Sequence, residues 1–263
     1  MITQKELYNQ LENLNIPHGK PIIIHNSLKA IGEIEGGGEA LLETLIKYAE
    51  ETQSLVCIPT HTWKTLVMDL GRPSSCLGVL PSLASKHPKG IRSMHPTHSI
   101  TVFGDRKRAE DFVRNEENVN TPTNPDGCYG NIVKEEGYVL LIGVNQTKNT
   151  IIHCIEEMLF VKNRLTEEKI EAKIIYKDGK EESRFLHWFD DAASSDVSLN
   201  FGKFEAAFRY FDVINDGYIG NAKTQLCSVS KIKKTLETIY KNAGDTELLS
   251  DDLPLDERLY KTE

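Results

Sequence analysis

Residues 21–48 constrain the fold of this chain more than any other segment. An apolar run typical of a β-strand, residues 22–24, ends at a polar His-Asn-Ser sequence, and a loop with three consecutive glycines at 36–38 follows. Apolar residues then recur at helical spacing, which predicts an amphipathic helix. Glycines let a ligand approach the backbone closely, and free N–H groups at the start of a helix bind anionic oxygen. The segment therefore predicts a strand, a glycine loop and a helix, and it suits either a phosphate cradle or an ordinary turn.

Apolar runs and helical patterns alternate along the chain. We expect strands at 21–24, 55–59, 99–103 and 138–144 and helices near 4–14, 38–51, 79–86, 105–114 and 150–160. Beyond residue 164 the pattern predicts an antiparallel hairpin of 171–176 and 182–187, a helix at 201–210, a strand at 217–226 and a last helix at 229–243. Such alternation is typical of a sheet covered by helices.

The sequence thus predicts an α/β protein in which residues 1–263 form a single domain. We expect a layered fold with a central mixed, largely parallel sheet flanked by helices, plus a C-terminal region of β-hairpin and helix. Weak order is expected from residue 244 onward, where the tail is acidic and poorly patterned.

Composition narrows the range of partners. The net charge of −8 argues against nucleic acid, and it suits a cationic ligand or simply keeps the protein in solution. Five scattered cysteines without CxxC spacing indicate reduced thiols rather than disulfides or a zinc site. The N-terminus has no signal-peptide pattern and no apolar run is long enough to cross a bilayer, so a cytoplasmic location is expected and a membrane partner is not.

Polar side chains cluster directly before or after three of the expected strands. His61 follows the strand at 55–59, and residues 92–99 place an arginine, two histidines and hydroxyl groups before the next strand. The loop after 138–144 leads to a helix with His153 and acidic residues one turn apart. Ligands bind at the carboxyl ends of strands in open α/β sheets, although each of these residues could also serve a structural role.

Metal binding and serine-hydrolase chemistry are not indicated. Five histidines could supply metal ligands, namely His25, His61, His95, His98 and His153, but no HExxH or acidic motif accompanies them, and we expect no metal. A nucleophile elbow of the GxSxG type is also missing from the sequence.

Five blocks resemble a known family in their order and spacing: HNSLKAIGEIEGGGEAL, LVCIPTHTW, IRSMHPTHSITVFG, VLLIGVNQTKNTIIHCIEE and DGYIGNAKTQL. They are similar to the signature blocks of the aminoglycoside 3-N-acetyltransferase (antibiotic N-acetyltransferase) family. The resemblance implies an α/β fold distinct from the GNAT acetyltransferases. It also implies an enzyme of antibiotic resistance that transfers an acetyl group from acetyl-CoA to the 3-N amine of an aminoglycoside.

The resemblance also implies roles for particular residues. His153 matches the family's catalytic base and Glu156 its glutamate, while the acid that orients the base is expected at Asp196, with Asp190 and Asp191 as alternatives. An imidazole that titrates near neutrality suits the removal of a proton from an amine. The residues expected to bind CoA are His25, Ser27, Leu28, Gly36, Gly37, Arg92, Ser93, His95 and Ser99.

Two departures from the family leave the acceptor open. Residues 126–130 read Asp-Gly-Cys-Tyr-Gly where many members have Gly-x-x-Ser-Pro-Leu, and Lys64 stands where an acid is often found. A lysine facing a polycation would repel it. The alternatives are therefore an acyltransferase for another small amine or amino sugar, or a CoA-binding protein without turnover; the sequence does not indicate an oligomeric state.

Overall fold

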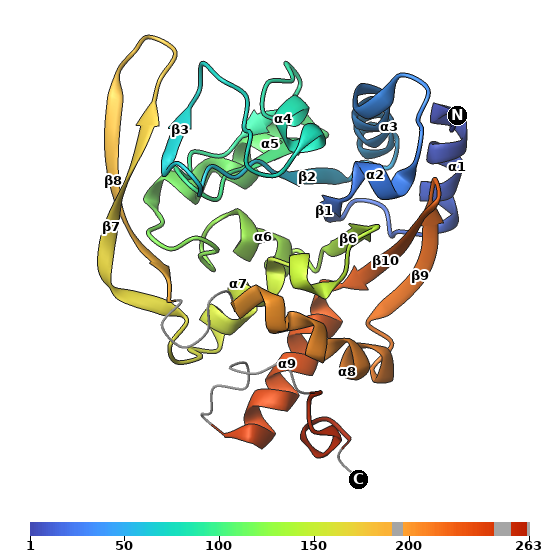
Figure 1. Cartoon of the computed structure of the whole chain (residues 1–263), viewed down its shortest axis with the longest axis vertical. Helices are drawn as coiled ribbons and strands as arrows, with labels where there is room; N and C mark the ends of the chain where they lie inside the picture. The colour runs from blue at the N-terminus through green and yellow to red at the C-terminus, as the bar shows by residue number, and fades with distance from the viewer. Residues whose placement is uncertain (191–196, 245–253, 262–263) are drawn as a thin grey trace.

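A seven-stranded sheet runs through the part of the chain that the structure describes, residues 1–190, 197–244 and 254–261 of this computed structural model (Figure 1). Its order is β4 (Ile91–Arg92), β5 (Ile100–Phe103), β2 (Leu55–Pro59), β1 (Pro21–Asn26), β6 (Tyr138–Ile142), β10 (Ala222–Ser228) and β9 (Ile214–Ile219). The mixed α/β architecture predicted from the sequence is confirmed.

The sheet is less parallel than predicted. Among the pairings of the described strands within this sheet, only β1 with β2 and β1 with β6 run parallel. The pairs β4 with β5, β5 with β2, β6 with β10, and β10 with β9 are antiparallel. The connections from β4 to β5 and from β9 to β10 are short, and a short connection permits only antiparallel pairing.

Helices cover both faces of this sheet. On one face, α1 (Gln4–Asn13), α3 (Gly37–Glu51) and α4 (Val79–Ala84) pack on Ile22 and Ile24 of β1. On the other, Ile23 faces α5 (Arg106–Val113), α6 (Cys128–Lys134), α7 (Ile151–Met158), α8 (Glu205–Tyr210) and α9 (Val229–Ala243). Successive residues of a strand point to opposite faces, so β1 contributes to two apolar cores at once.

The strand predicted at 217–226 is instead the hairpin of β9 and β10. The two strands pair Ile219 with Ala222 across a two-residue turn at Gly220 and Asn221. Gly220 has a φ of +57°, and a Cβ there would lie 2.5 Å from the carbonyl oxygen of Ile31. Only glycine fits this turn, because other residues are strained at positive φ and would clash with the neighbouring backbone.

A second sheet stands beside the first at one edge of the molecule (Figure 1). It consists of β3 (Val67–Asp69), β7 (Leu165–Ile175) and β8 (Glu181–Phe189), with β3 parallel to β7. The predicted hairpin is confirmed but longer than expected, and β3 was not predicted. The far end of β8 returns towards the main body, which brings Trp188 and Phe189 next to His98.

Short helices complete the chain. The 3-10 helices are η1 (Arg114–Asn118), η2 (Gln146–Lys148), η3 (Val197–Phe204) and η4 (Glu257–Leu259), and α2 (Leu28–Ile31) is a single α-helical turn. The helix predicted at 201–210 is divided between η3 and α8. In the described part of the tail, Leu255 and Tyr260 are buried in the core that contains α9. None of the described helices combines the length and apolar character needed to cross a membrane.

Candidate active site

A cleft of about 340 Å³ lies where the parallel strands β1, β2 and β6 end. His25 reaches it from the end of β1, His61 follows β2, and His153 comes from α7, which follows β6. Trp188 and Phe189 of β8 form another part of the wall. The carboxyl ends of three adjacent strands thus bring together side chains that are far apart in the sequence, as expected for an open α/β sheet.

His153 is held by aromatic rings. Its imidazole stacks on Phe189 with ring centroids 4.2 Å apart and meets the edge of Phe201 at 4.6 Å. The side chain is 8% exposed, and it lines the cleft from the first turns of α7. Packing on both sides restricts the ring to one plane, so a ligand in the cleft would meet a base of fixed orientation.

Glu156 lies one turn further along α7 but does not line the cleft. Its carboxylate is fully buried, accepting a hydrogen bond from Arg164 Nε (3.2 Å) and another from the Tyr240 hydroxyl (2.5 Å). Burial raises the pKa of Glu156, while Arg164 and the Tyr240 hydroxyl oppose that rise. Both carboxylate oxygens are therefore engaged in joining α7 to α9 and to the segment before β7.

The acid expected to orient His153 is only partly described. Asp196 and Asp191 lie outside the described residues. Asp190 directly follows Phe189, and its backbone N–H donates to the Arg164 carbonyl (3.1 Å). The assignment to Asp196, Asp190 or Asp191 stays a prediction.

The other cleft histidines are neutral at physiological pH. His25 Nε2 lies 3.1 Å from the Thr150 hydroxyl, and His61 Nε2 lies 2.7 Å from the Tyr129 hydroxyl. Burial and the nearby Lys148 lower the pKa of His25 to about 3. Burial and neighbouring histidines lower the pKa of His61 and His98 well below the usual value. These imidazoles can orient a ligand by hydrogen bonding, without contributing charge.

His95 is part of a buried loop and does not line the cleft. Its Nε2 is 3.0 Å from the Thr121 carbonyl oxygen, while Nδ1 accepts from the backbone N–H groups of Thr97 (3.2 Å) and His98 (2.9 Å). These contacts fix the neutral tautomer with hydrogen on Nε2. Burial lowers the pKa of His95 to about 4, with the bond to Thr121 opposing.

Arg92 and Ser99 fasten the β4–β5 hairpin to the end of β2, and Ser93 joins the two strands of that hairpin. Arg92 donates from Nε to Ser99 Oγ (3.1 Å) and from Nη2 to the Thr60 carbonyl (2.8 Å). Ser93 Oγ accepts from the backbone N–H of Ile100 (3.0 Å). Burial lowers the pKa of Arg92 to about 10, so it remains charged. None of the three lines the cleft as it is described.

The glycine loop forms the start of α3. Gly36 and Gly37 have φ values of +81° and +64°, which favour glycine, and no side chain of the described residues caps this helix. A Cβ on Gly38 would lie 3.0 Å from Val79 of α4 and 3.5 Å from Leu28. Ser27 Oγ accepts from the Ala30 N–H (3.3 Å) and caps α2. The uncapped N-terminus of α3 keeps backbone donors for an anionic group.

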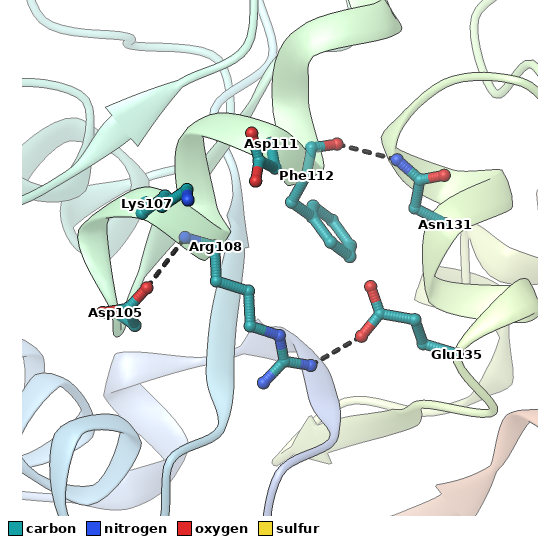
Figure 2. Close-up of a pocket in the computed structure, with 7 residues that line it drawn as sticks. All are labelled: Asp105, Lys107, Arg108, Asp111, Phe112, Asn131 and Glu135. Atoms are coloured by element: carbon teal, nitrogen blue, oxygen red, sulfur yellow. Dashed lines mark hydrogen bonds and ion pairs between the residues drawn. The ribbon is translucent and has the colours of Figure 1, made fainter.

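A second hollow lies between α5 and α6 (Figure 2). Arg108 crosses it and pairs with Glu135 (2.5 Å), and also donates to the carbonyls of Gly19 and Gln53. Gly19 and Gln53 precede β1 and β2, so this hollow is at the opposite end of the strands from the histidines. The Arg108 guanidinium is hydrogen-bonded within the protein, and we assign no chemistry to this hollow.

Sequence reasoning missed several residues in or beside the cleft: Tyr129, Asn149, Trp188 and Phe189. Tyr129 holds His61, and Trp188, Phe189 and Asn149 line the wall. The sequence signals for them were the departure from the family pattern at residues 126–130 and the aromatic pair at the end of a polar strand. As for a metal, the described residues contain no group of three or more His, Cys, Asp or Glu side chains placed to hold one.

The sequence is similar to a known family and to proteins within it. Residues 23–241 match the sequence pattern of a family described as aminoglycoside 3-N-acetyltransferase. A relative from Bacillus subtilis (strain 168), the SPbeta prophage-derived aminoglycoside N(3')-acetyltransferase-like protein YokD, is 23% identical over 206 residues, 68% of this chain and 75% of the relative.

Solved structures share the fold. An aminoglycoside acetyltransferase AAC(3)-IVa mutant in complex with gentamicin has a TM-score of 0.75 and 22% identity, covering 92% of this chain and 90% of that one. A structure described as AAC-IIIb binary with CoASH has a TM-score of 0.75 and 20% identity, covering 91% of this chain and 96% of that one. The predicted non-GNAT acetyltransferase architecture is confirmed.

Proposed function

Since the chain belongs to the aminoglycoside 3-N-acetyltransferase family, we propose that this acyltransferase moves the acetyl group of acetyl-CoA to an amine bound in the histidine-lined cleft. The observation that carries the proposal is the position of His153: an imidazole fixed between aromatic rings at the cleft wall, on the helix that follows β6. A general base must lie within reach of the proton that it removes, and this is the position from which it could do so.

The proposed reaction is a direct transfer. His153 takes a proton from the acceptor amine, the amine nitrogen forms a bond to the acetyl carbonyl carbon, and the bond from that carbon to sulfur breaks. The proton on His153 then passes to the departing thiolate, so the products are an amide and CoA as the free thiol. A base of this kind contributes on the order of a hundred- to ten-thousand-fold to the rate.

CoA is proposed to bind beside the cleft. The uncapped N-terminus of α3 supplies backbone N–H groups for phosphate oxygens, and Leu77 of the segment before α4 lines the cleft nearby. In this proposal the loops around the cleft are supported by four residues that do not themselves bind CoA: Arg92, Ser93, His95 and Ser99. A direct contact with CoA would require these residues to give up hydrogen bonds that they make within the protein.

An aminoglycoside is the first candidate acceptor, because the relatives carry that name and the protein's net charge of −8 suits a cation. Two lysines favour a second candidate, a small amine with less positive charge. Lys148 lines the cleft, and Lys64 lies 5.5 Å above the ring of Trp63, another cleft residue. Their charge would oppose a polycation more than a monoamine.

The test is release of free thiol from acetyl-CoA with a panel of aminoglycosides, amino sugars and simple amines, with the product identified by mass. We expect turnover that depends on the amine and a product heavier by one acetyl group. Turnover with simple amines alone would select the second candidate. CoA binding without thiol release for any amine in the panel would contradict the proposed function and leave a binding protein.

A further inference from the structure

A series of hydrogen-bonded side chains runs from α8 to the wall of the cleft. Gln225 of β10 donates from Nε2 to Glu205 Oε1 (3.1 Å), and its Oε1 accepts from Gln146 Nε2 (2.9 Å). Gln146 Oε1 in turn accepts from Asn149 Nδ2 (2.8 Å). An ionised carboxylate can only accept, so Glu205 sets the direction of every bond in the series. The amide of Asn149 is therefore oriented, with its oxygen at the end of the series.

Asn149 Oδ1 is an acceptor without a donor. The side chain is 1% exposed, and no described residue donates a hydrogen bond to this oxygen. Turning the amide over would not help, because Nδ2 would then lose its partner on Gln146. Buried acceptors in native proteins almost always have a partner, so a water molecule or a ligand is expected at this one. Asn149 lines the cleft four residues before His153.

We propose that Asn149 Oδ1 accepts a hydrogen bond from the same acceptor amine that His153 deprotonates. The inference rests on the acetyl transfer proposed above and adds a residue that binds the amine. A primary amine in its neutral form has two N–H bonds: one proton goes to His153, and the other N–H remains bonded to Asn149 while the nitrogen attacks and is retained in the amide product. Two acceptors on one nitrogen would fix the direction of its lone pair towards the acetyl carbonyl, which lowers the entropic part of the barrier.

The experiment compares a primary amine with its N-methyl derivative, at saturating acetyl-CoA, in wild-type protein and in Asn149→Leu. The N-methyl compound has one N–H fewer, so we expect the wild type to prefer the primary amine at least about tenfold in kcat/KM. The amine nitrogen gains positive charge as it attacks, so loss of its hydrogen bond to Asn149 should lower kcat/KM for the primary amine by about 10- to 100-fold in Asn149→Leu. The ratio of kcat/KM for the primary amine to kcat/KM for the N-methyl amine should fall towards one in Asn149→Leu. The KM for acetyl-CoA should stay the same.

Asn145→Leu is the matched control. Asn145 lies in the same loop and accepts bonds from Thr147, but it does not line the cleft, so its replacement disturbs the loop without removing the acceptor. If Asn149→Leu does not fold, Gln225→Leu replaces it: without Gln225 the amides of Gln146 and Asn149 can turn over together, and the preference for the primary amine should drop at least about threefold, a fraction of the effect of one hydrogen bond.

Unchanged amine preference in Asn149→Leu, with an active wild type, would overturn this inference alone. A raised KM for acetyl-CoA with unchanged amine kinetics would also overturn it, because the N–H would then belong to the amides of CoA. A wild type that acetylates no amine would instead contradict the proposed function, so the two failures are distinguishable.

Discussion

Both ring nitrogens of His95 are used within the protein, and only the neutral ring can use them. Nδ1 accepts two backbone N–H groups, so a proton on that nitrogen would break the loop that carries His98 into the cleft. The pKa of about 4 reflects this burial. At the residue scale, His95 therefore links the stability of the loop to pH.

Replacing His95 by glutamine should reduce the loss of stability in acid. The unfolded chain binds a proton at residue 95 below about pH 6.5, whereas the folded protein does not until about pH 4. Stability from this group is present above pH 6.5 and is lost as the pH falls, by about 1.4 kcal/mol per pH unit. Denaturant unfolding of wild type and His95→Gln between pH 7 and pH 5 measures the difference in slope; parallel slopes would show that His95 is protonated in the folded state.

Glu156 is expected to matter for folding through its buried pair with Arg164. Glu156→Leu removes one member of this buried pair, which costs about 3–5 kcal/mol. The exposed Glu167→Ala is the control. A melting temperature of Glu156→Leu within a degree or two of the wild type, together with loss of turnover, would instead support the direct catalytic role implied by the family resemblance.

At the scale of elements, the ends of the strands form the cleft, and the loops determine which further side chains line it. The apolar runs and their polar ends could be read from the sequence, because period-2 patterns and buried runs are local properties; His25, His61, His98 and His153 do meet in one cleft. The contribution of β8 to the cleft wall could not be predicted, because it depends on where the hairpin of β7 and β8 lies. That position involves the pairing of β3 with β7, between residues about 100 positions apart in the sequence.

Tyr129 and Asn149 show the same limit. Neither carries a spacing pattern that predicts chemistry, and their roles appear only once α6 and the loop before α7 are placed beside His61 and His153. The Gly-Asn pair between β9 and β10 is a local turn signal, but the apolar residues on both sides of it favour an unbroken strand, so the sequence pattern predicts no turn there.

The N-terminus of α3 is expected to tolerate no β-branched residue at Gly37. Its φ of +64° lies in the left-handed region, where a valine would cost roughly 1–2 kcal/mol. Nothing lies within 4 Å of the added Cβ, so the effect comes from the backbone and should displace the N–H groups proposed for CoA. We expect the KM for acetyl-CoA to rise at least about tenfold in Gly37→Val.

Gly19→Val is the matched control for that measurement. Gly19 has a similar φ of +73° and equally open space around its Cβ, but it precedes β1 at the other end of the sheet. It should show the same backbone strain with an unchanged KM. Equal KM values for acetyl-CoA in Gly37→Val and wild type would place the phosphate site elsewhere.

At the scale of the whole molecule, the seven-stranded sheet is shared by two apolar cores. Ile22 and Ile24 face one core and Ile23 faces the other, so β1 joins the two cores. The expectation that residues 1–263 act as one domain therefore takes a testable form: unfolding should be a single cooperative transition.

The two tryptophans make this test simple. Trp63 and Trp188 both line the cleft, so their fluorescence reports on the site, while far-ultraviolet circular dichroism reports on all helices and strands. We expect both signals to change at the same denaturant concentration. A fluorescence transition that precedes the loss of helix would show that the cleft and the hairpin of β7 and β8 unfold separately.

The most direct test of the whole account is the kinetic effect of His153→Gln. Glutamine keeps a polar side chain of similar length but cannot act as a base near neutral pH. We predict that kcat for acetyl transfer falls at least about a hundredfold while the affinity for CoA stays nearly unchanged, because the base acts on the amine and not on the phosphates. His87→Gln, outside the cleft, should leave both values unchanged. A kcat close to that of the wild type in His153→Gln would contradict the assignment of His153 as the general base.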